Sequence, residues 1–160
     1  MFDITKSTNE VFSWRRHYET SIDAQIRTIS SLVASNCLKK HSVFNKTDYW
    51  KDKVVLDAGC GGGTKANAYA QCKAKTVIGI DGSKLALSAA EIVSEKFQNK
   101  NTIFREGFLE NLLDILGKED IDRVDHITCA QVIHHCEGWK DIIRQFSDCL
   151  SDGGFLQIIS

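Results

Sequence analysis

Apolar residues recur at spacings of three and four between residues 20 and 40, which is the period of one face of an α-helix. The residues on this face are Ile22, Ile26, Ile29, Val33 and Cys37. Residues 41–52 are mostly polar and contain the aromatics Tyr49 and Trp50. They are expected to connect this first helix to the rest of the chain.

After residue 53 the pattern changes to short apolar runs that alternate with helical periods, and such runs indicate buried strands. The runs lie at residues 54–58, 76–80, 101–106, 124–130 and 155–160. The segments between them predict helices at residues 64–74, 84–97, 108–116 and 139–150. In the second of these helices, the side chains expected to face the core are Leu85, Ala89, Ile92, Val93 and Phe97. A polar turn, Ser151 to Gly154, is expected before the last strand.

Strands separated by helices imply βαβ units, whose right-handed crossovers build a parallel sheet with helices on both faces. The sequence therefore predicts an α/β fold with a doubly wound, mostly parallel sheet over residues 53–160. Residues 1–52 form a helical lead-in. In such sheets ligands bind outside the carboxyl ends of the strands, where the strand order reverses.

The stretch VVLDAGCGGGTKANAYA, residues 54–70, places four glycines directly after the first predicted strand. Glycine lets the backbone approach a ligand closely because it has no Cβ. The phosphate-binding pattern G-x-x-x-x-G-K-[ST] fails, because Lys65 is followed by alanine. The dinucleotide pattern G-x-G-x-x-G/A fits only from Gly61, and that register leaves Asp57 unexplained. The pattern D-x-G-x-G-x-G fits completely, from Asp57 to Gly63.

Two further segments accompany this loop. VIGIDGSKLAL, residues 77–87, ends the second strand with an acid at Asp81. VDHITCAQVIHHCEGWKDIIRQFSDCLSDGGFLQI, residues 124–158, contains a strand, a loop with two histidines, a helix and a Gly-Gly turn in that order. Together the three segments resemble the class I S-adenosylmethionine-dependent methyltransferases over about residues 54–159. The resemblance implies a Rossmann-like fold, S-adenosyl-L-methionine as cofactor, and methyl transfer to an acceptor.

The resemblance also implies where the cofactor lies. The carboxylate of Asp81 would accept hydrogen bonds from both ribose hydroxyls, and the helix after the glycine loop would present N–H groups to the methionine carboxylate. In many relatives the third strand is followed by Gly-Asp, and that aspartate helps to hold the adenine amino group. Here the pair is Gly107-Phe108, so Phe108 would contribute its ring or its backbone N–H, or else Glu106 or Glu110 would substitute. The residues assigned to the cofactor site are Asp57, Gly59, Cys60, Gly61, Asp81, Gly82, Gly107, Phe108 and Cys129.

His134 and His135 are the candidates for catalysis, because a histidine is suited to take a proton from a hydroxyl or amine acceptor. The alternative is that one packs under its loop while the other faces the cleft without catalysing. Relatives with many different acceptors carry a similar pair, which favours this alternative. The adjacent residues His134 to Glu137 cannot all converge on one ion, so no metal site is expected.

Charge and composition limit the partners. Lysine and arginine total 20 against 21 for aspartate and glutamate, a net charge of −1. Nucleic-acid-binding domains usually carry a basic excess, so a small-molecule acceptor is expected rather than a nucleic acid. The N-terminus lacks an apolar signal region and no apolar run is long enough for a membrane helix. A cytoplasmic protein without membrane contact is therefore expected, with its six cysteines reduced.

The end of the sequence departs from the family. The family sheet normally has seven strands, and the last two are absent here because the chain stops with the fifth. That strand would be an open apolar edge, so a fragment of a longer protein is expected, or else a partner that covers the edge.

Two other functions stay open at this stage. One is a nicotinamide-dependent (NAD) oxidoreductase of the Rossmann type, because those enzymes also end the second strand with an acid. The other is a truncated cofactor-binding module without turnover. The N-terminal helix, with Trp14, Tyr18, Tyr49 and Trp50, is expected to cap the cofactor cleft, or alternatively only to cover the sheet.

Overall fold

The computed structural model describes residues 22–34 and 48–159 of the chain. Within them, five strands form one sheet in the order β3-β2-β1-β4-β5. The strands are β1 (Val54–Ala58), β2 (Thr76–Asp81), β3 (Thr102–Glu106), β4 (Val124–Ala130) and β5 (Leu150–Ile159). All four pairings between neighbouring strands are parallel. The predicted parallel sheet is thereby confirmed.

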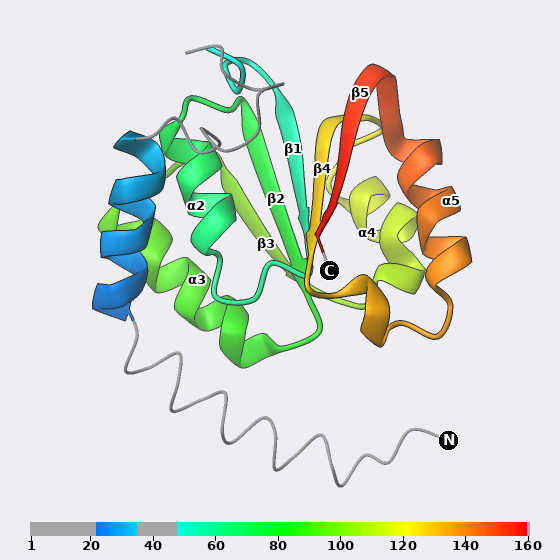
Figure 1. Ribbon diagram of the computed structural model, residues 1–160, viewed down its shortest axis with the longest axis horizontal. Coiled ribbons are helices and arrows are strands. Elements are labelled where there is room, and N and C mark those ends of the chain that lie inside the picture. The colour runs from blue at the N-terminus through cyan, green and yellow to red at the C-terminus, as the bar shows by residue number, and fades with distance from the viewer. Residues whose placement is uncertain (1–21, 35–47, 160) are drawn as a thin grey trace, which may run out of the picture.

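Helices lie on both faces of this sheet (Figure 1). Helix 22–34, α2 (Thr64–Gln71) and α3 (Lys84–Lys96) cover one face, and α4 (Leu112–Lys118) and α5 (Trp139–Cys149) cover the other. The 3-10 turns η2 (Leu109–Asn111) and η3 (Ile133–His135) precede α4 and α5. Each face has its own hydrophobic cluster, because neighbouring residues of a strand, such as Val55 and Leu56, point to opposite faces.

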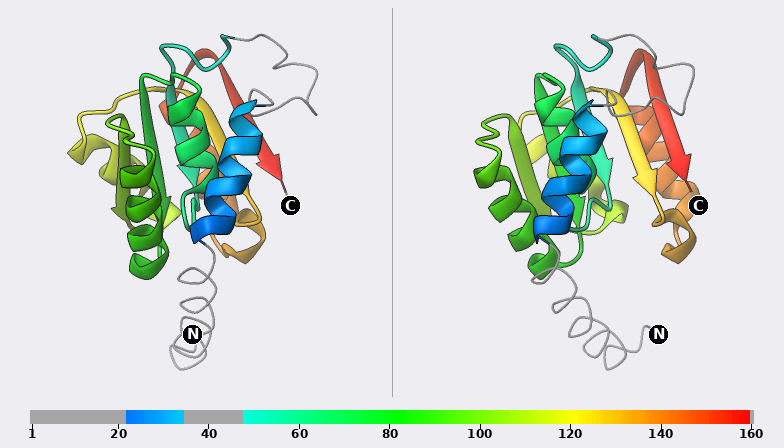
Figure 2. Two further views of the ribbon diagram at one scale, coloured as in Figure 1. Left: turned by 90° about the vertical axis from the view of Figure 1, so that its left-hand side faces the viewer. Right: turned by 60° about the vertical axis from the view of Figure 1, so that its left-hand side comes forward.

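The strand order reverses between β1 and β4, so the chain leaves β1 toward one face and β4 toward the other. All arrowheads in Figure 2 point the same way, which brings the loops after β1, β2, β3 and β4 to one edge of the sheet. This carboxyl edge, at the switch between β1 and β4, is the expected place for a ligand in an open α/β sheet.

The predicted inner face of α3 is partly confirmed, because Ala89 and Val93 are buried and Phe97 packs against the hydrophobic cluster that contains Val93. Ile92 was expected inside, but its side chain is 43% exposed. Leu87 and Ala90, which were not predicted, are buried beside Val93. The reason is close contact with the start of α2: a Cβ built on Gly63 would lie only 2.5 Å from Cβ of Ala90. The two small residues let the helix backbones approach and so set the rotation of α3.

An aromatic cluster fills the sheet face near the start of β1. Trp50 is 1% exposed and packs against Tyr69 of α2 and His126 of β4, with ring centroids 4.3 Å and 4.7 Å away. Tyr49 bonds to His126 through its hydroxyl and Nδ1, 3.1 Å apart. Burial, with a smaller effect of the charge of Lys53, lowers the pKa of His126 to about 4, so this histidine is neutral at pH 7.

For Tyr49 and Trp50, the position of this cluster agrees with the second of the two expectations, in which they only cover the sheet. Tyr49 and Trp50 precede β1 and therefore lie at the amino edge of the sheet, opposite the carboxyl edge. The ring of Trp50 is buried against the sheet and α2, and Tyr49 is partly buried beside it, so these two residues cover the sheet and do not cap a cleft beyond the strand ends. Trp14 and Tyr18 lie outside the described residues, as does Cys37 of the predicted first helix.

The two edge strands of the sheet are β3 and β5, and they differ in their local structure. At β3, Arg105 folds back so that Nη1 donates to the carbonyl of Phe104 at 2.8 Å, while Nη2 donates to Glu119 at 2.7 Å. At β5 the strand bounds are Leu150–Ile159, but its pairing to β4 passes from Leu150 opposite Val124 directly to Phe155 opposite His126, so the predicted turn residues lie in an unpaired segment, in which Gly153 has a φ of 74°. The Ser151–Gly154 segment is accommodated as an irregularity within the strand.

Candidate functional site

The loop between β1 and α2 is held against β2 by its backbone. The N–H groups of Gly59 and Cys60 both donate to the carbonyl of Ile80, at 2.8 Å and 3.0 Å, and the N–H of Gly63 donates to the carbonyl of Cys60 at 2.9 Å. Three glycines have positive φ angles, 75° at Gly59, 52° at Gly61 and 74° at Gly63. L-residues rarely adopt this conformation, so the alternating glycines are required by the path of the loop.

Gly59 is also required by a contact across the switch point. A Cβ built on Gly59 would lie 2.2 Å from Cγ2 of Val132, in the loop that follows β4. The glycine loop and the β4–α5 loop are therefore in contact, and both lie at the carboxyl edge of the sheet.

Asp57 lies beneath this loop, 3% exposed, near the end of β1. Its Oδ2 accepts the N–H of Ala66 in the first turn of α2 at 3.1 Å. The first N–H groups of a helix lack intrahelical acceptors and carry partial positive charge, which favours a carboxylate here. Burial nevertheless raises the pKa of Asp57 to about 6, although the charge of Lys65 and the Ala66 hydrogen bond both lower it. Above about pH 6 the buried side chain is ionised, and the buried charge then lowers the stability of the folded state.

Asp81 at the end of β2 is held by both of its carboxylate oxygens. Oδ2 accepts the N–H of Gly61 at 2.8 Å, and Oδ1 accepts the N–H of Ser83 at 2.9 Å. Each oxygen has a second lone pair, so the side chain is oriented and can still accept from a ligand. The carboxylate is therefore placed beside the glycine loop with fixed geometry.

Gly107 and Phe108 follow β3 and lie next to Asp81. The N–H of Gly107 donates to the carbonyl of Asp81 at 3.0 Å. Phe108 is 67% exposed, and a Cβ built on Gly82 would lie 3.1 Å from its ring atom Cε1. The three segments that follow β1, β2 and β3 thus meet around the Asp81 carboxylate.

The glycine loop after β1 and the acid Asp81 at the end of β2 agree with what a comparison with known proteins shows. Residues 50–160 match a family model described as a methyltransferase domain. The chain belongs to the S-adenosylmethionine-dependent methyltransferases. The Rossmann-like class of its sheet and S-adenosyl-L-methionine as the family's cofactor are confirmed by this match, whereas nothing supports the alternative of a nicotinamide-dependent oxidoreductase.

Relatives within the methyltransferases differ in what their names say they act on. The ubiquinone biosynthesis O-methyltransferase of Vibrio parahaemolyticus is 29% identical over 119 residues, which are 74% of this chain and 48% of that protein. Protein arginine N-methyltransferase 1 of Saccharomyces cerevisiae is 33% identical over 122 residues, 74% of this chain and 32% of that protein. The chain thus spans about half or less of the length of these relatives.

Solved structures share the fold of this methyltransferase chain. A Methanococcus maripaludis protein assigned as an S-adenosylmethionine-dependent methyltransferase superposes with a TM-score of 0.68 at 18% identity, covering 92% of this chain and 62% of that one. The Trypanosoma brucei PRMT1 enzyme–prozyme complex with AdoHcy gives a TM-score of 0.55 at 23% identity, covering 69% of this chain and 34% of that one.

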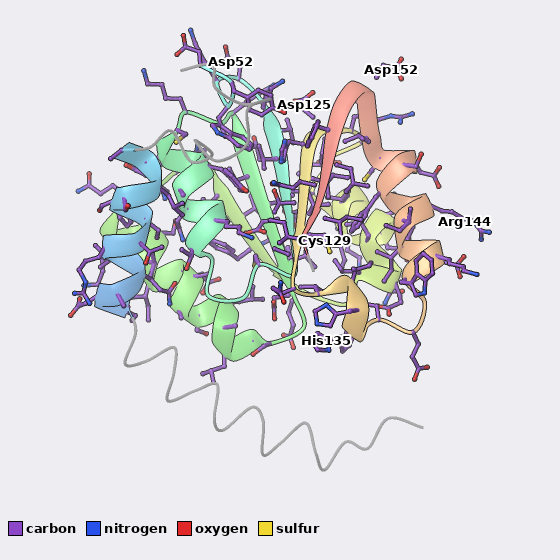
Figure 3. All side chains as sticks on the ribbon, in the orientation of Figure 1. Asp52, Asp125, Cys129, His135, Arg144 and Asp152 are labelled. Atoms are coloured by element: carbon purple, nitrogen blue, oxygen red, sulfur yellow. The ribbon has the colours of Figure 1, made fainter. Side chains whose placement is uncertain are left out.

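The two histidines of the methyltransferase domain lie in the β4–α5 loop at the carboxyl edge, where His135 is labelled in Figure 3. Both side chains are exposed, and their ring centroids are 4.0 Å apart. Neither is buried under the loop, so that part of the alternative interpretation is wrong. In residues 22–34 and 48–159, no group of three or more His, Cys, Asp or Glu side chains could hold a metal ion.

The thiols of the two cysteines assigned to the cofactor site point into the core, and for Cys60 only the backbone was expected to line the site. A Cβ built on Gly79 would lie 2.8 Å from Sγ of Cys60, and burial raises the pKa of this thiol well above its usual range. Cys129 is fully buried, and burial raises its pKa to about 11. Their thiols are therefore unreactive, and only their backbones are positioned to line a ligand. Cys60, Cys129, Cys136 and Cys149 form no disulfide.

Two contributions to the site had no recognisable signal in the sequence. Val132 fixes how closely the β4–α5 loop approaches Gly59, and nothing in its own sequence context indicates this. Gln25 of helix 22–34 is 8% exposed, and its Oε1 accepts the hydroxyl of Thr64 at 3.1 Å. The N-terminal helix thus reaches the start of α2, beside the glycine loop.

Proposed function

We propose that this chain binds S-adenosyl-L-methionine at the carboxyl edge of β1, β2 and β3 and transfers its methyl group to a small-molecule acceptor. The observation that carries the proposal is the Asp81 carboxylate, oriented by two backbone N–H groups beside three glycines with positive φ. Glycines without a Cβ let the loop backbone approach a ligand closely, and the oriented carboxylate beside them suits a ribose with its attached amino-acid chain.

Each part of the site would hold one part of the cofactor. Asp81 would accept the ribose hydroxyls, and the first turn of α2 would face the methionine carboxylate. Asp57 lies beneath the loop and would support the amino-acid moiety through it. The sulfonium supplies an activated methyl group, so the contribution of the protein is to bind, orient and exclude water, and positioning of this kind supplies about 7–11 kcal/mol.

The acceptor side lies above the β4–α5 loop in this proposal. His134 and His135 are exposed there and are the groups that would take a proton from an acceptor hydroxyl. Two observations support a small molecule over a nucleic acid: the net charge of −1, and the name of the related ubiquinone biosynthesis O-methyltransferases. In the described part of the chain, no helix combines the length and apolar character needed to cross a bilayer.

Asp81→Ala tests the proposed site. We expect it to weaken binding of S-adenosylhomocysteine at least tenfold, about 1.4 kcal/mol, because a charged acceptor for two hydroxyls is lost. The affinity is measured by titration calorimetry, with the melting temperature recorded for each variant. An affinity equal to that of the wild type would show that Asp81 does not contribute to cofactor binding.

Asp125→Ala is the matched control for this substitution. Asp125 Oδ2 accepts the N–H of Val54 at 2.8 Å, so the variant also loses a bond between a carboxylate and a backbone N–H. Asp125 lies at the amino edge of the sheet, opposite His135 (Figure 3). Its loss should lower stability without weakening S-adenosylhomocysteine binding. Equal weakening in both variants would mean that Asp81 acts only through folding.

Turnover separates an enzyme from a module that only binds. The chain is incubated with S-adenosylmethionine carrying a labelled methyl group and a panel of phenols and catechols. Labelled acceptor together with S-adenosylhomocysteine supports the proposal. Cofactor binding without label in any acceptor would favour the non-catalytic module.

A further inference from the structure

Asn67 of α2 is completely buried, although asparagine is mostly found at protein surfaces. Both ends of its side-chain amide are hydrogen-bonded. Nδ2 donates to the carbonyl of Gly63 at 3.0 Å and to the carbonyl of Ala90 in α3 at 3.2 Å, and Oδ1 accepts Nδ2 of Asn99 at 2.8 Å. The side chain therefore ties the end of the glycine loop to α3 and to the turn that follows α3.

Helix formation and core packing do not account for an amide at this position. Asparagine is a weak helix former, and burying its amide costs the hydration of two polar groups. The other buried residues of α2 are three alanines and Tyr69. What the amide adds is a second hydrogen bond on the carbonyl of Gly63, which already accepts the backbone N–H of Asn67 at 2.9 Å.

The carbonyl of Gly63 shares a peptide plane with the N–H of Thr64. In a trans peptide these two groups point in opposite directions, so a fixed carbonyl also fixes the N–H. Gly63 is the N-cap of α2, with a φ of 74° and no side-chain capping bond. Glycine restrains its own backbone less than any other residue. The two hydrogen bonds on its carbonyl therefore determine where the Thr64 N–H points.

The first turn of α2 has two N–H groups that a ligand could use. The N–H of Ala66 donates to Asp57, whereas those of Thr64 and Lys65 have no acceptor in the described part of the chain. Unpaired N–H groups at the start of a helix favour a carboxylate. The direction of the Thr64 N–H thus affects the anionic end of the proposed ligand and not its adenosine end.

We propose that Asn67 is a positioning residue for the amino-acid end of the cofactor. By holding the carbonyl of Gly63, it aims the N–H of Thr64 at the methionine carboxylate. The inference rests on the proposed function and adds to it the side chain that orients one donor. Without the amide, the Gly63–Thr64 peptide can rotate, so this donor is lost while the contact of the ribose with Asp81 is kept.

Two ligands separate the ends of the cofactor. S-adenosylhomocysteine has the amino-acid chain, and methylthioadenosine has the adenosine and the thioether without it. Calorimetric titration of Asn67→Ala should show S-adenosylhomocysteine weakened about fivefold or more, because a hydrogen bond to a charged group is lost. Methylthioadenosine should stay within about twofold of its wild-type affinity, since it has no carboxylate to lose a donor.

Asn67→Ser tests the bond to Gly63 by itself. Serine and alanine leave nearly the same space, but a serine hydroxyl in a helix can donate to the carbonyl four residues earlier. Ser88 of α3 donates in this way to Lys84 at 3.0 Å. Asn67→Ser should therefore recover most of the affinity for S-adenosylhomocysteine that Asn67→Ala loses.

Asn101→Ala is the matched control. Nδ2 of Asn101 also donates to two carbonyls, those of Ala70 at 3.4 Å and Ala74 at 2.7 Å, near the other end of α2. This variant should lower the melting temperature but keep the wild-type ratio of the two affinities.

Nuclear magnetic resonance of the isotope-labelled wild-type chain gives a test that does not depend on how the variants fold. The Thr64 N–H resonance should shift with S-adenosylhomocysteine and much less with methylthioadenosine. Four results would overturn the inference while the proposed function stands: equal weakening of both ligands in Asn67→Ala, no recovery in Asn67→Ser, a changed ratio in Asn101→Ala, or a Thr64 resonance that responds equally to both ligands. Failure of the wild-type chain to bind S-adenosylhomocysteine would overturn both the inference and the proposed function.

Discussion

Gly59→Ala is expected to destabilise the domain by about 2–5 kcal/mol and to abolish S-adenosylhomocysteine binding. Two costs add at this position. Alanine is strained at a φ of 75°, and its Cβ would lie 2.2 Å from Cγ2 of Val132. To relieve the contact, the β4–α5 loop has to move away from the glycine loop, which opens the switch point. Chemical denaturation measures the first effect and calorimetric titration the second.

The chain offers a matched control and a partial rescue. Gly117 in α4 has nothing within 4 Å of a built Cβ, so Gly117→Ala should be neutral or stabilising by about 0.5–1 kcal/mol. Adding Val132→Ala to Gly59→Ala removes the clash but not the strain at φ, so part of the stability should return. A Gly59→Ala variant that binds with wild-type affinity would contradict the described geometry of the loop.

Asp57→Asn is expected to raise the stability of the domain at neutral pH while weakening the site. The pKa of Asp57 rises from 3.8 to about 6 on folding, chiefly because of burial. The folded state therefore holds a proton that the unfolded state releases between these values, and wild-type stability falls as the pH rises through this range. The rise corresponds to about 3 kcal/mol, which asparagine does not lose because it has no charge.

Denaturation of both proteins at pH 4 and pH 7.5 tests this expectation. The difference in free energy of unfolding between Asp57→Asn and the wild type should be small at pH 4 and should favour the variant at pH 7.5. Binding of S-adenosylhomocysteine should weaken by about fivefold or more, as loss of a charged partner beneath the loop implies. A variant that is less stable than the wild type at pH 7.5 would show that the ionised carboxylate stabilises the fold.

Much of the fold could be predicted because its signals are local. β1, β2 and β4 are apolar runs bounded by polar residues, and β4 spans Val124–Ala130 as predicted. Ser83 caps α3 by accepting the N–H of Ala86 at 3.3 Å, and a serine directly before a helical period is a local signal of this kind. The D-x-G-x-G-x-G spacing identified the loop because the positive φ angles at alternate glycines are a requirement of its path.

The remaining features depend on contacts between distant segments. The rotation of α3 is set by Gly63 against Ala90, and periodicity alone did not distinguish this face from the one with Ile92. Trp50 is buried by Tyr69 and His126, which are far from it in sequence. The backbone of Cys60 was expected to line the site, and the sequence alone did not show that its side chain packs against Gly79. In each case the residue could be identified from the sequence, but its packing partners could not, because they lie in distant segments.

The most direct test of S-adenosylmethionine binding is a calorimetric titration of this chain with S-adenosylhomocysteine and, separately, with NAD. The D-x-G-x-G-x-G loop and the match of residues 50–160 to a methyltransferase domain predict saturable binding of S-adenosylhomocysteine and none of NAD at the same concentrations. Binding of NAD in preference to S-adenosylhomocysteine, or of neither ligand, would contradict the proposed site.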